Sequence, residues 1–246
     1  MKVFEHINEI KKHIDQLKVE GKTIGFVPTM GALHNGHLSL VKQSKKENDI
    51  TVVSIFVNPI QFNDKNDLKN YPRVIDTDIT LLESVQADIL FSPSELEMYP
   101  EPVTEKWDFG QLETVMEGKH RPGHFNGVAV VVKKLFEIVT PHNSYFGLKD
   151  FQQLTIIKEM VRRLQLPITI KECGIVREVD GLAMSSRNAL LSPEERKNAA
   201  QISKILVSAL RQAPYHTPQS LKKWVEEQFN SRSEEHTSEL QSRYVI

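Results

Sequence analysis

Short runs of apolar, often β-branched residues alternate with longer amphipathic stretches from residue 7 to residue 173, and this alternation limits the possible folds most strongly. The short runs are too brief for typical helices and are predicted to be strands buried on both faces; they are residues 23–27, 50–57, 87–91, 144–146 and 168–173. Helices are predicted over residues 7–17, 38–47, 76–85, 126–139 and 151–164. Strands that alternate with helices in this way predict an α/β fold with a doubly wound parallel sheet.

A second, mainly helical lobe is expected after the turn Asp180-Gly181. Ser192, Pro193 and Glu194 have the residue types that typically begin a helix, and helices are predicted over 193–211 and 218–229. The expected domains are therefore a Rossmann-like domain, residues 1–179, and a smaller C-terminal lobe, residues 180–231.

The last stretch, residues 232–246, is polar and shows no pattern of a packed element. It resembles the translation of a common sequencing adapter. We therefore expect the natural sequence to end near Ser231 and residues 232–246 to carry no function.

The composition argues against several classes of partner. Lys and Arg total 31 against 32 Asp and Glu, so no net basic field favours nucleic acid. No apolar run approaches the roughly 20 residues of a membrane-spanning helix, and the start does not resemble a signal peptide. Cys173 is the single cysteine, which excludes an intrachain disulfide framework or a multi-cysteine zinc site. We expect a cytoplasmic protein with neither nucleic-acid nor membrane partners.

The turn His34-Asn35-Gly36-His37 follows the first predicted strand and leads into a helix. Backbone N–H groups and the positive end of the helix attract an anion at such a junction. Two histidines three residues apart can both donate to phosphate oxygens, and Gly31 and Gly36 permit close approach of the backbone. The turn predicts a site for nucleotide phosphates; two surface histidines beside a tight turn are the alternative.

Two further segments suit phosphate. Gly147-Leu148-Lys149-Asp150 ends a predicted strand, at the sheet edge where open parallel sheets bind ligands. Lys149 would neutralise phosphate charge there, and Asp150 would bond a nucleotide hydroxyl. Met184-Ser185-Ser186-Arg187 combines two hydroxyls with a guanidinium that can grip two oxygens at once. A helix cap with a surface lysine and a solvated turn are the respective alternatives.

The segment after the second predicted strand offers neutral polar groups. Asn58 and Gln61 suit hydroxyls and a carboxylate, and Gln153 is expected to face the same cavity. Turn chemistry at the end of a strand is the alternative; it explains Asn58-Pro59 but not Gln61 between two apolar neighbours.

Six motifs in one order carry a resemblance that covers residues 1 to about 200. They are T-M-G-A-L-H-N-G-H, F-V-N-P-I-Q-F, Y-P-R, R-P-G-H-F, F-G-x-K-D-F-Q-Q-L and D-G-L-A-M-S-S-R-N. Together they are similar to the pantothenate synthetase family of the HxGH nucleotidyltransferase superfamily. The resemblance implies an AMP-forming ligase that joins pantoate to β-alanine through a pantoyl-adenylate and releases pyrophosphate. It also implies ATP as a substrate, Mg²⁺, and a homodimer formed through the first domain.

The resemblance also implies a role for individual residues. ATP contacts are implied for Met30, Gly31, Ala32, Leu33, His34, Asn35, Gly36, His37, Gly147, Leu148, Lys149, Asp150, Val176, Met184, Ser185, Ser186 and Arg187. The catalytic residues would be His37, His34, Lys149 and Arg187. Pantoate would contact Gln61 and Gln153, with Asn58 and Arg121 as secondary candidates, and Gln61 would also serve β-alanine. No direct protein ligand to magnesium is expected; Asp76 and Asp78 are candidates for its outer shell only.

Two departures from the family stand out. Leu148 occupies a position that is usually polar, while its neighbours Lys149 and Asp150 are intact. The family's second domain continues past the point where this chain becomes adapter-like, so the C-terminal lobe, expected to act as a lid over ATP, is predicted to be incomplete.

Two other functions remain open. One is another HxGH adenylyltransferase, which would need an additional basic cluster for a phosphorylated acceptor; Asn58 and Gln61 argue against it. The other is an inactive nucleotide-binding module, favoured only if the truncation is natural. Catalysis is favoured by the presence of four residues: His34, His37, Lys149 and Arg187.

Overall fold

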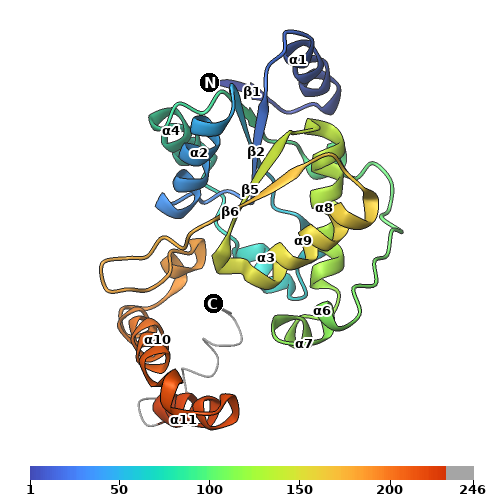
Figure 1. Ribbon diagram of the computed structural model, residues 1–246. Coiled ribbons are helices and arrows are strands. Elements are labelled where there is room, and N and C mark those ends of the chain that lie inside the picture. Colours follow the sequence, from blue (N-terminus) through green and yellow to red (C-terminus); the bar gives the residue numbers. More distant parts are fainter. Residues whose placement is uncertain (231–246) are drawn as a thin grey trace. The chain divides into compact units, whose positions relative to one another are not determined.

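The computed structural model describes residues 1–230, and the chain divides into two compact units (Figure 1). The first unit is Met1–Gly174, and the second begins at Ile175. The boundary expected from the sequence, after residue 179, lies a few residues further along the chain. The expectation that residues 232–246 derive from an adapter falls outside the described residues.

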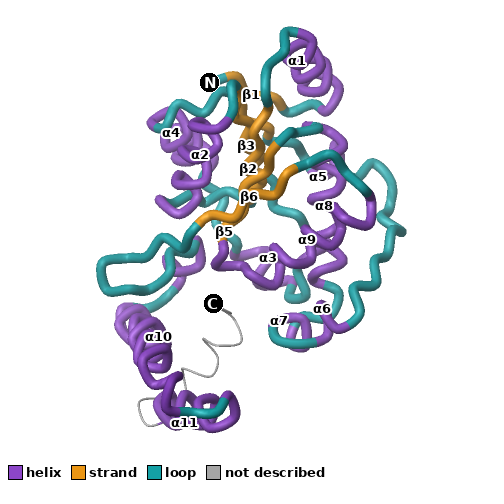
Figure 2. The backbone as a smooth tube through the Cα atoms, in the orientation of Figure 1, coloured by secondary structure: helices purple, strands orange, loops and turns teal. Residues whose placement is uncertain are grey.

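A six-stranded parallel sheet forms the centre of the first unit (Figure 2). Its strand order is β1-β4-β3-β2-β5-β6. The strands are β1 (Lys2–Phe4), β2 (Ile24–Thr29), β3 (Ile50–Ile55), β4 (Ile89–Phe91), β5 (Asn143–Gly147) and β6 (Thr169–Cys173). The predicted parallel α/β sheet is confirmed, and every predicted strand is present. The edge strand β1 was not predicted, because three half-exposed residues carry no periodic pattern.

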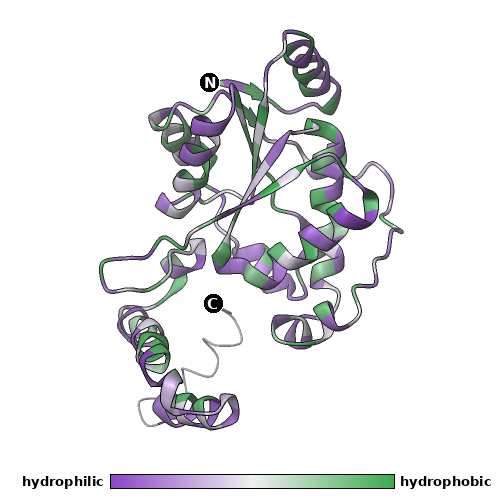
Figure 3. Ribbon diagram, in the orientation of Figure 1, coloured by the Kyte–Doolittle hydropathy of each residue, from purple (hydrophilic) through white to green (hydrophobic). Residues whose placement is uncertain are grey.

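Helices cover both faces of this sheet (Figure 1). One face carries α1 (Ile7–Val19), α8 (His124–Val139) and α9 (Phe151–Leu164); the other carries α2 (Asn35–Glu47) and α4 (Ile75–Ser84). Phe26 and Val52 pack toward α8, whereas their chain neighbours Val27 and Val53 pack toward α2. Successive side chains of a strand point to opposite faces, so burial on both faces requires the continuous apolar runs seen in the sequence. Hydrophobic colour accordingly follows the central strands and α8 (Figure 3).

Short helices fill the connections of the first unit. They are η1 (Pro59–Gln61), α3 (Lys65–Asn70), α5 (Glu95–Met98), α6 (Gln111–Thr114), α7 (Glu117–His120) and η2 (Leu148–Asp150). None was predicted, because elements of three to six residues are too short to show a helical period. Within residues 1–230, no helix combines the length and apolar character needed to cross a membrane.

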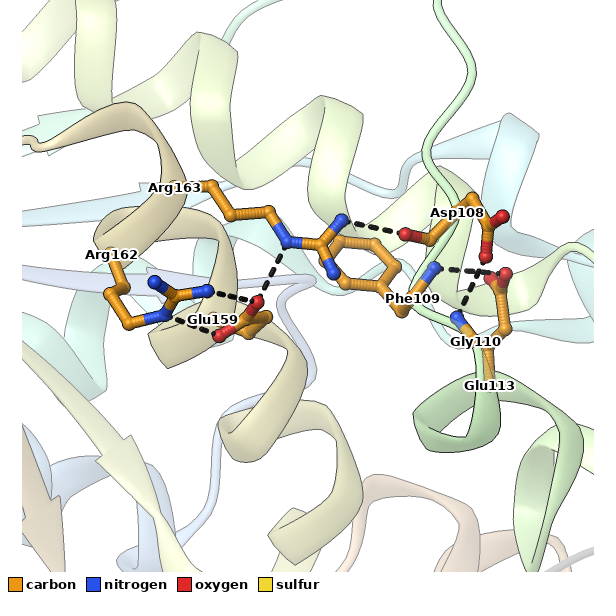
Figure 4. Close-up of polar contacts among 7 residues, drawn as sticks. All are labelled: Asp108, Phe109, Gly110, Glu113, Glu159, Arg162 and Arg163. Carbon is orange, nitrogen blue, oxygen red and sulfur yellow. Dashed lines mark hydrogen bonds and ion pairs between the residues drawn. The ribbon is translucent and has the colours of Figure 1, made fainter.

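The long connection from β4 to α8 is tied to α9 (Figure 4). Arg163 donates to the carbonyl oxygen of Asp108 at 2.6 Å, and its guanidinium lies 5.2 Å from the centroid of the Phe109 ring. The carboxylate of Glu159 orients this arginine at 2.7 Å and also accepts from Arg162. The connection, which carries Arg121, is therefore anchored to α9 by side-chain contacts.

The second unit contains α10 (Pro193–Gln212) and α11 (Pro218–Asn230), with η3 (Ser186–Leu190) and η4 (Ala213–Tyr215) before and between them. Ser192 and Glu195 form a reciprocal capping box at the start of α10, and Arg196 pairs with Asp180 at 2.6 Å. The predictions of helices over 193–211 and 218–229 are confirmed.

Gly25 on β2 should not tolerate a side chain. A Cβ there would lie 2.2 Å from Ser44 Oγ and 2.5 Å from Asn48 Nδ2. Both atoms are held by hydrogen bonds, to Thr51 and Tyr145 respectively, so neither can move freely. We expect Gly25→Ala to lower the free energy of unfolding in urea by about 1–3 kcal/mol.

Gly174→Ala is the matched control, because a Cβ at Gly174 would meet nothing within 4 Å. It should leave the free energy of unfolding within about 0.5 kcal/mol of the wild type. Equal losses in the two variants would contradict the close packing of α2 on β2.

Candidate active site

The carboxyl ends of three adjacent central strands bring together the residues that are predicted to bind substrates. β2 leads into the turn with His34 and His37, β3 leads to Asn58 and Gln61, and β5 leads to Lys149. The chain builds the sheet outward from β2 in both directions, through β3 and β4 on one side and β5 and β6 on the other. In open parallel sheets, ligands bind at the carboxyl ends of the strands where the order reverses in this way.

A buried carboxylate shapes the turn after β2. Gly31 and Ala32 both have positive φ, at 81° and 48°. Asp78, on the first turn of α4 and 1% exposed, accepts from the backbone N–H groups of Ala32 at 2.9 Å and Leu33 at 2.7 Å. Thr29 Oγ1 adds a bond from the Gly31 N–H at 3.1 Å. The turn is therefore held in its left-handed conformation before any ligand binds.

The side chains of both histidines cap backbone N–H groups at the start of α2. The Nδ1 atom of His34 accepts from the N–H of Gly36 at 3.1 Å, and the Nδ1 atom of His37 accepts from the N–H of His34 at 3.3 Å. The ring centroids are 4.1 Å apart. Since a backbone N–H can only donate, both Nδ1 atoms are unprotonated, and each neutral ring carries its proton on Nε2.

The surroundings keep both rings neutral. Burial lowers the pKa of His37 to about 3, with the neighbouring His34 acting in the same direction. Burial also lowers the pKa of His34 to about 4, reinforced by the positive charge of Lys149. Both imidazoles are therefore uncharged donors at neutral pH.

Backbone N–H groups of the turn serve a different purpose from the one expected from the sequence. Those of Ala32, Leu33, His34 and Gly36 all bond within the protein. The expectation that the backbone N–H groups of this turn point at an anion is wrong for these four. The turn also offers two side-chain donors, the Nε2 atoms of His34 and His37.

Lys149 and Asp150 lie in the same part of the molecule as the histidines. They belong to η2, which directly follows β5, and Lys149 Nζ is 2.9 Å from Asp150 Oδ1. Both charges act on the rings of His34 and His37. Leu148 packs against the larger hydrophobic cluster, which accounts for an apolar residue at this position.

The amide pair after β3 contacts the turn directly. Asn58 and Gln61 are 1% and 7% exposed, and Asn58 Nδ2 donates to Gln61 Oε1 at 3.1 Å. The Nε2 atom of Gln61 lies 3.0 Å from the sulfur of Met30, which belongs to the turn. The structure thus joins the residues expected to hold pantoate to the residues expected to hold ATP.

The other two candidates for pantoate lie after α7 and on α9. Arg121 follows α7 and pairs with Glu117 at 2.6 Å. Gln153 is half-buried in the first turn of α9. Its neighbour Gln152 was not predicted from the sequence to have a role. Gln152 is buried and accepts from the N–H of Glu117 at 3.0 Å. Gln152 thereby holds the helix that precedes Arg121.

The remaining candidates for ATP belong to the second unit. They are Val176, Met184, Ser185, Ser186 and Arg187. Within that unit the N–H of Met184 bonds Val176 at 3.0 Å, and Ser185 Oγ accepts from the N–H of Arg187 at 3.3 Å. Their contact with ATP remains a prediction.

The magnesium candidates differ sharply in burial. Asp76 is exposed, whereas Asp78 is buried and carries two backbone bonds. Among residues 1–230, no group of three or more His, Cys, Asp or Glu side chains is arranged to hold a metal ion. An outer-shell role for either aspartate remains a prediction.

Comparisons with known proteins all point to the same family. Residues 2–245 match the family model described as pantoate-beta-alanine ligase. The pantothenate synthetase of Bacteroides fragilis is 57% identical over 227 residues, covering 92% of this chain and 80% of that protein. The pantothenate synthetase of Porphyromonas gingivalis is 52% identical over 231 residues, covering 94% and 82%.

Solved structures agree with the sequence relatives. The crystal structure of pantothenate synthetase from Thermus thermophilus superposes with a TM-score of 0.87 at 41% identity, covering 92% of this chain and 81% of that one. Pantoate-beta-alanine ligase from Francisella tularensis, complexed with beta-gamma ATP and beta-alanine, has a TM-score of 0.83 at 40% identity, covering 92% and 85%.

Replacing Asp78 should loosen the turn. In Asp78→Asn one amide oxygen can still accept, but the NH₂ group faces the second backbone N–H and leaves it unpaired. We expect the free energy of unfolding to fall by about 1–3 kcal/mol. Asp76→Asn, an exposed change on the same helical turn, should cost about 0.5 kcal/mol or less. Similar losses from both changes would argue against a special role for Asp78.

The neutral histidines should make stability depend on pH. Their folded pKa values lie below the ordinary value of 6.5, so their contribution is complete above about pH 6.5. It is lost as the pH falls toward 4 and 3, because the unfolded chain binds protons that the folded chain does not.

The double variant His34→Asn, His37→Asn keeps side-chain acceptors but lacks these titrations. Between pH 7 and pH 5, the wild type should lose roughly 2–4 kcal/mol more unfolding free energy than this variant, the lower figure allowing for solvent screening. Urea unfolding at the two pH values measures the difference, and parallel pH profiles would show that the rings titrate normally.

Proposed function

The chain belongs to the pantoate–beta-alanine ligase family, and we propose that the edge formed by β3, β2 and β5 is where it activates pantoate with ATP. A carboxylate oxygen of pantoate attacks the α-phosphorus of ATP, and the bond to the β-phosphate breaks to release pyrophosphate. The amine of β-alanine then attacks the acyl carbon of the pantoyl-adenylate and loses a proton. AMP leaves, and the amide bond of pantothenate remains.

The observation that carries this proposal is the pair of neutral histidines beside Lys149. Their Nδ1 atoms are occupied, so the rings are oriented and their Nε2–H groups are the donors left for phosphate oxygens. Donors that are fixed in advance stabilise the charge that develops on those oxygens as the α-phosphorus is attacked. His37 is the proposed catalytic histidine, with His34 as a second donor and Lys149 as the positive charge.

Pantoate requires alignment rather than a protein nucleophile. Its carboxylate already carries the attacking oxygen, so catalysis reduces to position and charge stabilisation. Asn58 and Gln61 are proposed to hold it, with Gln153 and Arg121 in secondary roles, and Gln61 also serves β-alanine. Burial raises the pKa of the Cys173 thiol, which is consistent with a packing role for that residue.

We further propose that residues of the second unit contact ATP. The residues concerned are Val176, Met184, Ser185, Ser186 and Arg187. The guanidinium of Arg187 would grip two phosphate oxygens at once. Gly147 and Asp150 would contact the nucleotide from β5, and Asn35 and Gly36 from the turn.

Magnesium is proposed to accompany ATP. The ion would be held mainly by phosphate oxygens and water, since Mg²⁺ keeps several waters and needs few protein ligands. Asp78, a carboxylate already beside the turn, fits an outer-shell position, and Asp76 is the second candidate. The ion would neutralise phosphate charge. We further propose a cytoplasmic homodimer.

The reaction predicts a strict order of substrate dependence. Pyrophosphate should be released from ATP only when pantoate is present, and AMP should accumulate as β-alanine is added. Coupled assays of pyrophosphate and AMP measure both steps. Pyrophosphate release with a phosphorylated acceptor but not with pantoate would instead identify an adenylyltransferase of another kind.

Replacing His37 should affect chemistry more than binding. We expect His37→Ala to slow adenylate formation by about 10²–10³-fold while the pantoate dissociation constant changes far less, because the contact matters mainly in the transition state. His142→Ala is the matched control: its Nδ1 also accepts a backbone N–H, from Ile24 at 2.9 Å, at the amino edge of the sheet. Equal losses of rate and of binding in His37→Ala would refute the assigned role.

A further inference from the structure

A chain of hydrogen bonds outside the proposed site determines which way Asn58 faces. Asn58 Nδ2 lies 3.1 Å from the carbonyl oxygen of Gly127 on α8. A carbonyl oxygen can only accept, so the amide nitrogen of Asn58 must face Gly127. Its oxygen then faces the hydroxyl of Tyr99 at 2.9 Å, and that hydroxyl must be the donor.

The orientation of Asn58 in turn determines that of Gln61. The second proton of Asn58 Nδ2 points at Gln61 Oε1, 3.1 Å away. The oxygen of the Gln61 amide is therefore turned toward Asn58. Its NH₂ group is turned toward residues 30–37, the turn that carries His34 and His37 (the phosphate turn), and lies 3.0 Å from Met30 Sδ. A thioether is a weak acceptor, so a ligand oxygen can readily replace it.

The backbone of Gln61 is held from the same helix. His124 Nδ1 donates to the carbonyl oxygen of Gln61 at 2.8 Å. A Cβ on Gly127 would lie 2.6 Å from Gln61 Cα and from the oxygen of Ile60, so glycine alone permits this approach of α8 to η1. The backbone and the side-chain amide of Gln61 are thus both held from α8, the backbone by His124 and the amide through Asn58. The amide cannot turn over without breaking a buried hydrogen bond.

Tyr99 stands at the outer end of this chain. It follows α5, and its ring packs edge-on against Phe56 with 5.9 Å between the ring centroids. Burial raises the pKa of Tyr99, so its hydroxyl keeps the proton that it donates. Packing holds the ring in position, and the hydroxyl acts on Asn58 by donating its hydrogen bond.

We propose that Tyr99 is a positioning residue for the acyl substrate: through Asn58 it holds the Gln61 amide with its NH₂ group toward the phosphate turn, so that the site selects a ligand that presents an acceptor oxygen. The hydroxyl of Tyr99 does not touch the substrate. This role rests on the proposed contact between Gln61 and pantoate. It adds a specificity determinant from a segment that carries none of the ATP or pantoate contacts assigned above.

The test compares Tyr99→Phe with Tyr145→Phe. Both changes remove a hydroxyl from a largely buried tyrosine and keep the ring. The hydroxyl of Tyr145 bonds Asn48 at 2.7 Å and Glu47 at 3.0 Å, at the far end of α2 from the histidines. Tyr145→Phe therefore reports the cost of losing a buried hydroxyl without any effect on Gln61.

Steady-state release of pyrophosphate gives the KM for each substrate. We expect Tyr99→Phe to raise the KM for pantoate about tenfold while the KM for ATP stays within about twofold. Tyr145→Phe should leave both values within about twofold. An unchanged pantoate KM in Tyr99→Phe, or an equal rise of both KM values, would overturn the positioning role.

The failure of this role differs from the failure of the proposed function. A wild type that releases no pyrophosphate with pantoate would refute the function. A wild type that does so, together with a Tyr99→Phe variant of unchanged pantoate KM, would refute the positioning role alone.

A measurement on the wild type covers the case in which Tyr99→Phe does not fold. The side-chain NH₂ signals of Gln61 are assigned in a ¹⁵N-labelled sample by their absence in Gln61→Met. Pantoate added with α,β-methylene-ATP, whose methylene bridge prevents transfer of the adenylyl group to pantoate, should shift these signals. Signals that do not move would mean that the amide oxygen, rather than the NH₂ group, faces the substrate, and would overturn the proposal.

Discussion

The candidate site depends on two hydrogen bonds from the backbone to imidazole nitrogens. The N–H groups of Gly36 and His34 donate to the Nδ1 atoms of His34 and His37, and these bonds determine at once the orientation, the tautomer and the charge of both rings. A protonated ring would lose its bond, because Nδ1 could no longer accept. The start of α2 and the chemistry of the site therefore depend on the same neutral imidazoles.

The rest of the first unit holds this pair in place. The parallel sheet supplies the edge, Asp78 holds the turn that leads into the histidines, and β5 delivers Lys149 beside them. The amide pair of Asn58 and Gln61 reaches the same turn from β3. Each part arrives from a different strand end, which is why a doubly wound sheet suits a reaction that must align two substrates.

Much of this arrangement could be predicted from the sequence because it is written in local patterns. Strands buried on both faces, such as β2 and β3, require continuous apolar runs, and Ser192 with Pro193 marks the start of α10 in the residues themselves. The turn after the first strand could be identified in the same way. The edge strand β1 and the short helices could not, because three to six residues carry no period.

The contacts that set the chemistry of the site have no local signature. Asp78 lies 45 residues from Leu33, and Tyr99 lies 41 residues from Asn58. An aspartate in the first turn of a helix suggests a surface position or a metal shell, and only the fold brings it to the N–H groups of the turn. For the same reason, four backbone N–H groups that were expected to point at an anion, those of Ala32, Leu33, His34 and Gly36, bond within the protein instead.

The most direct measurement of this account follows the imidazole nitrogens of His34 and His37 by ¹⁵N NMR as α,β-methylene-ATP is added in the presence of pantoate. The account predicts that, from pH 7 down to pH 5, both rings carry a proton on Nε2 only, and that the nucleotide shifts the Nε2 signals while Nδ1 stays unprotonated. Rings that titrate near pH 6.5 in the free protein, that carry the proton on Nδ1, or whose Nε2 signals ignore the nucleotide would contradict it.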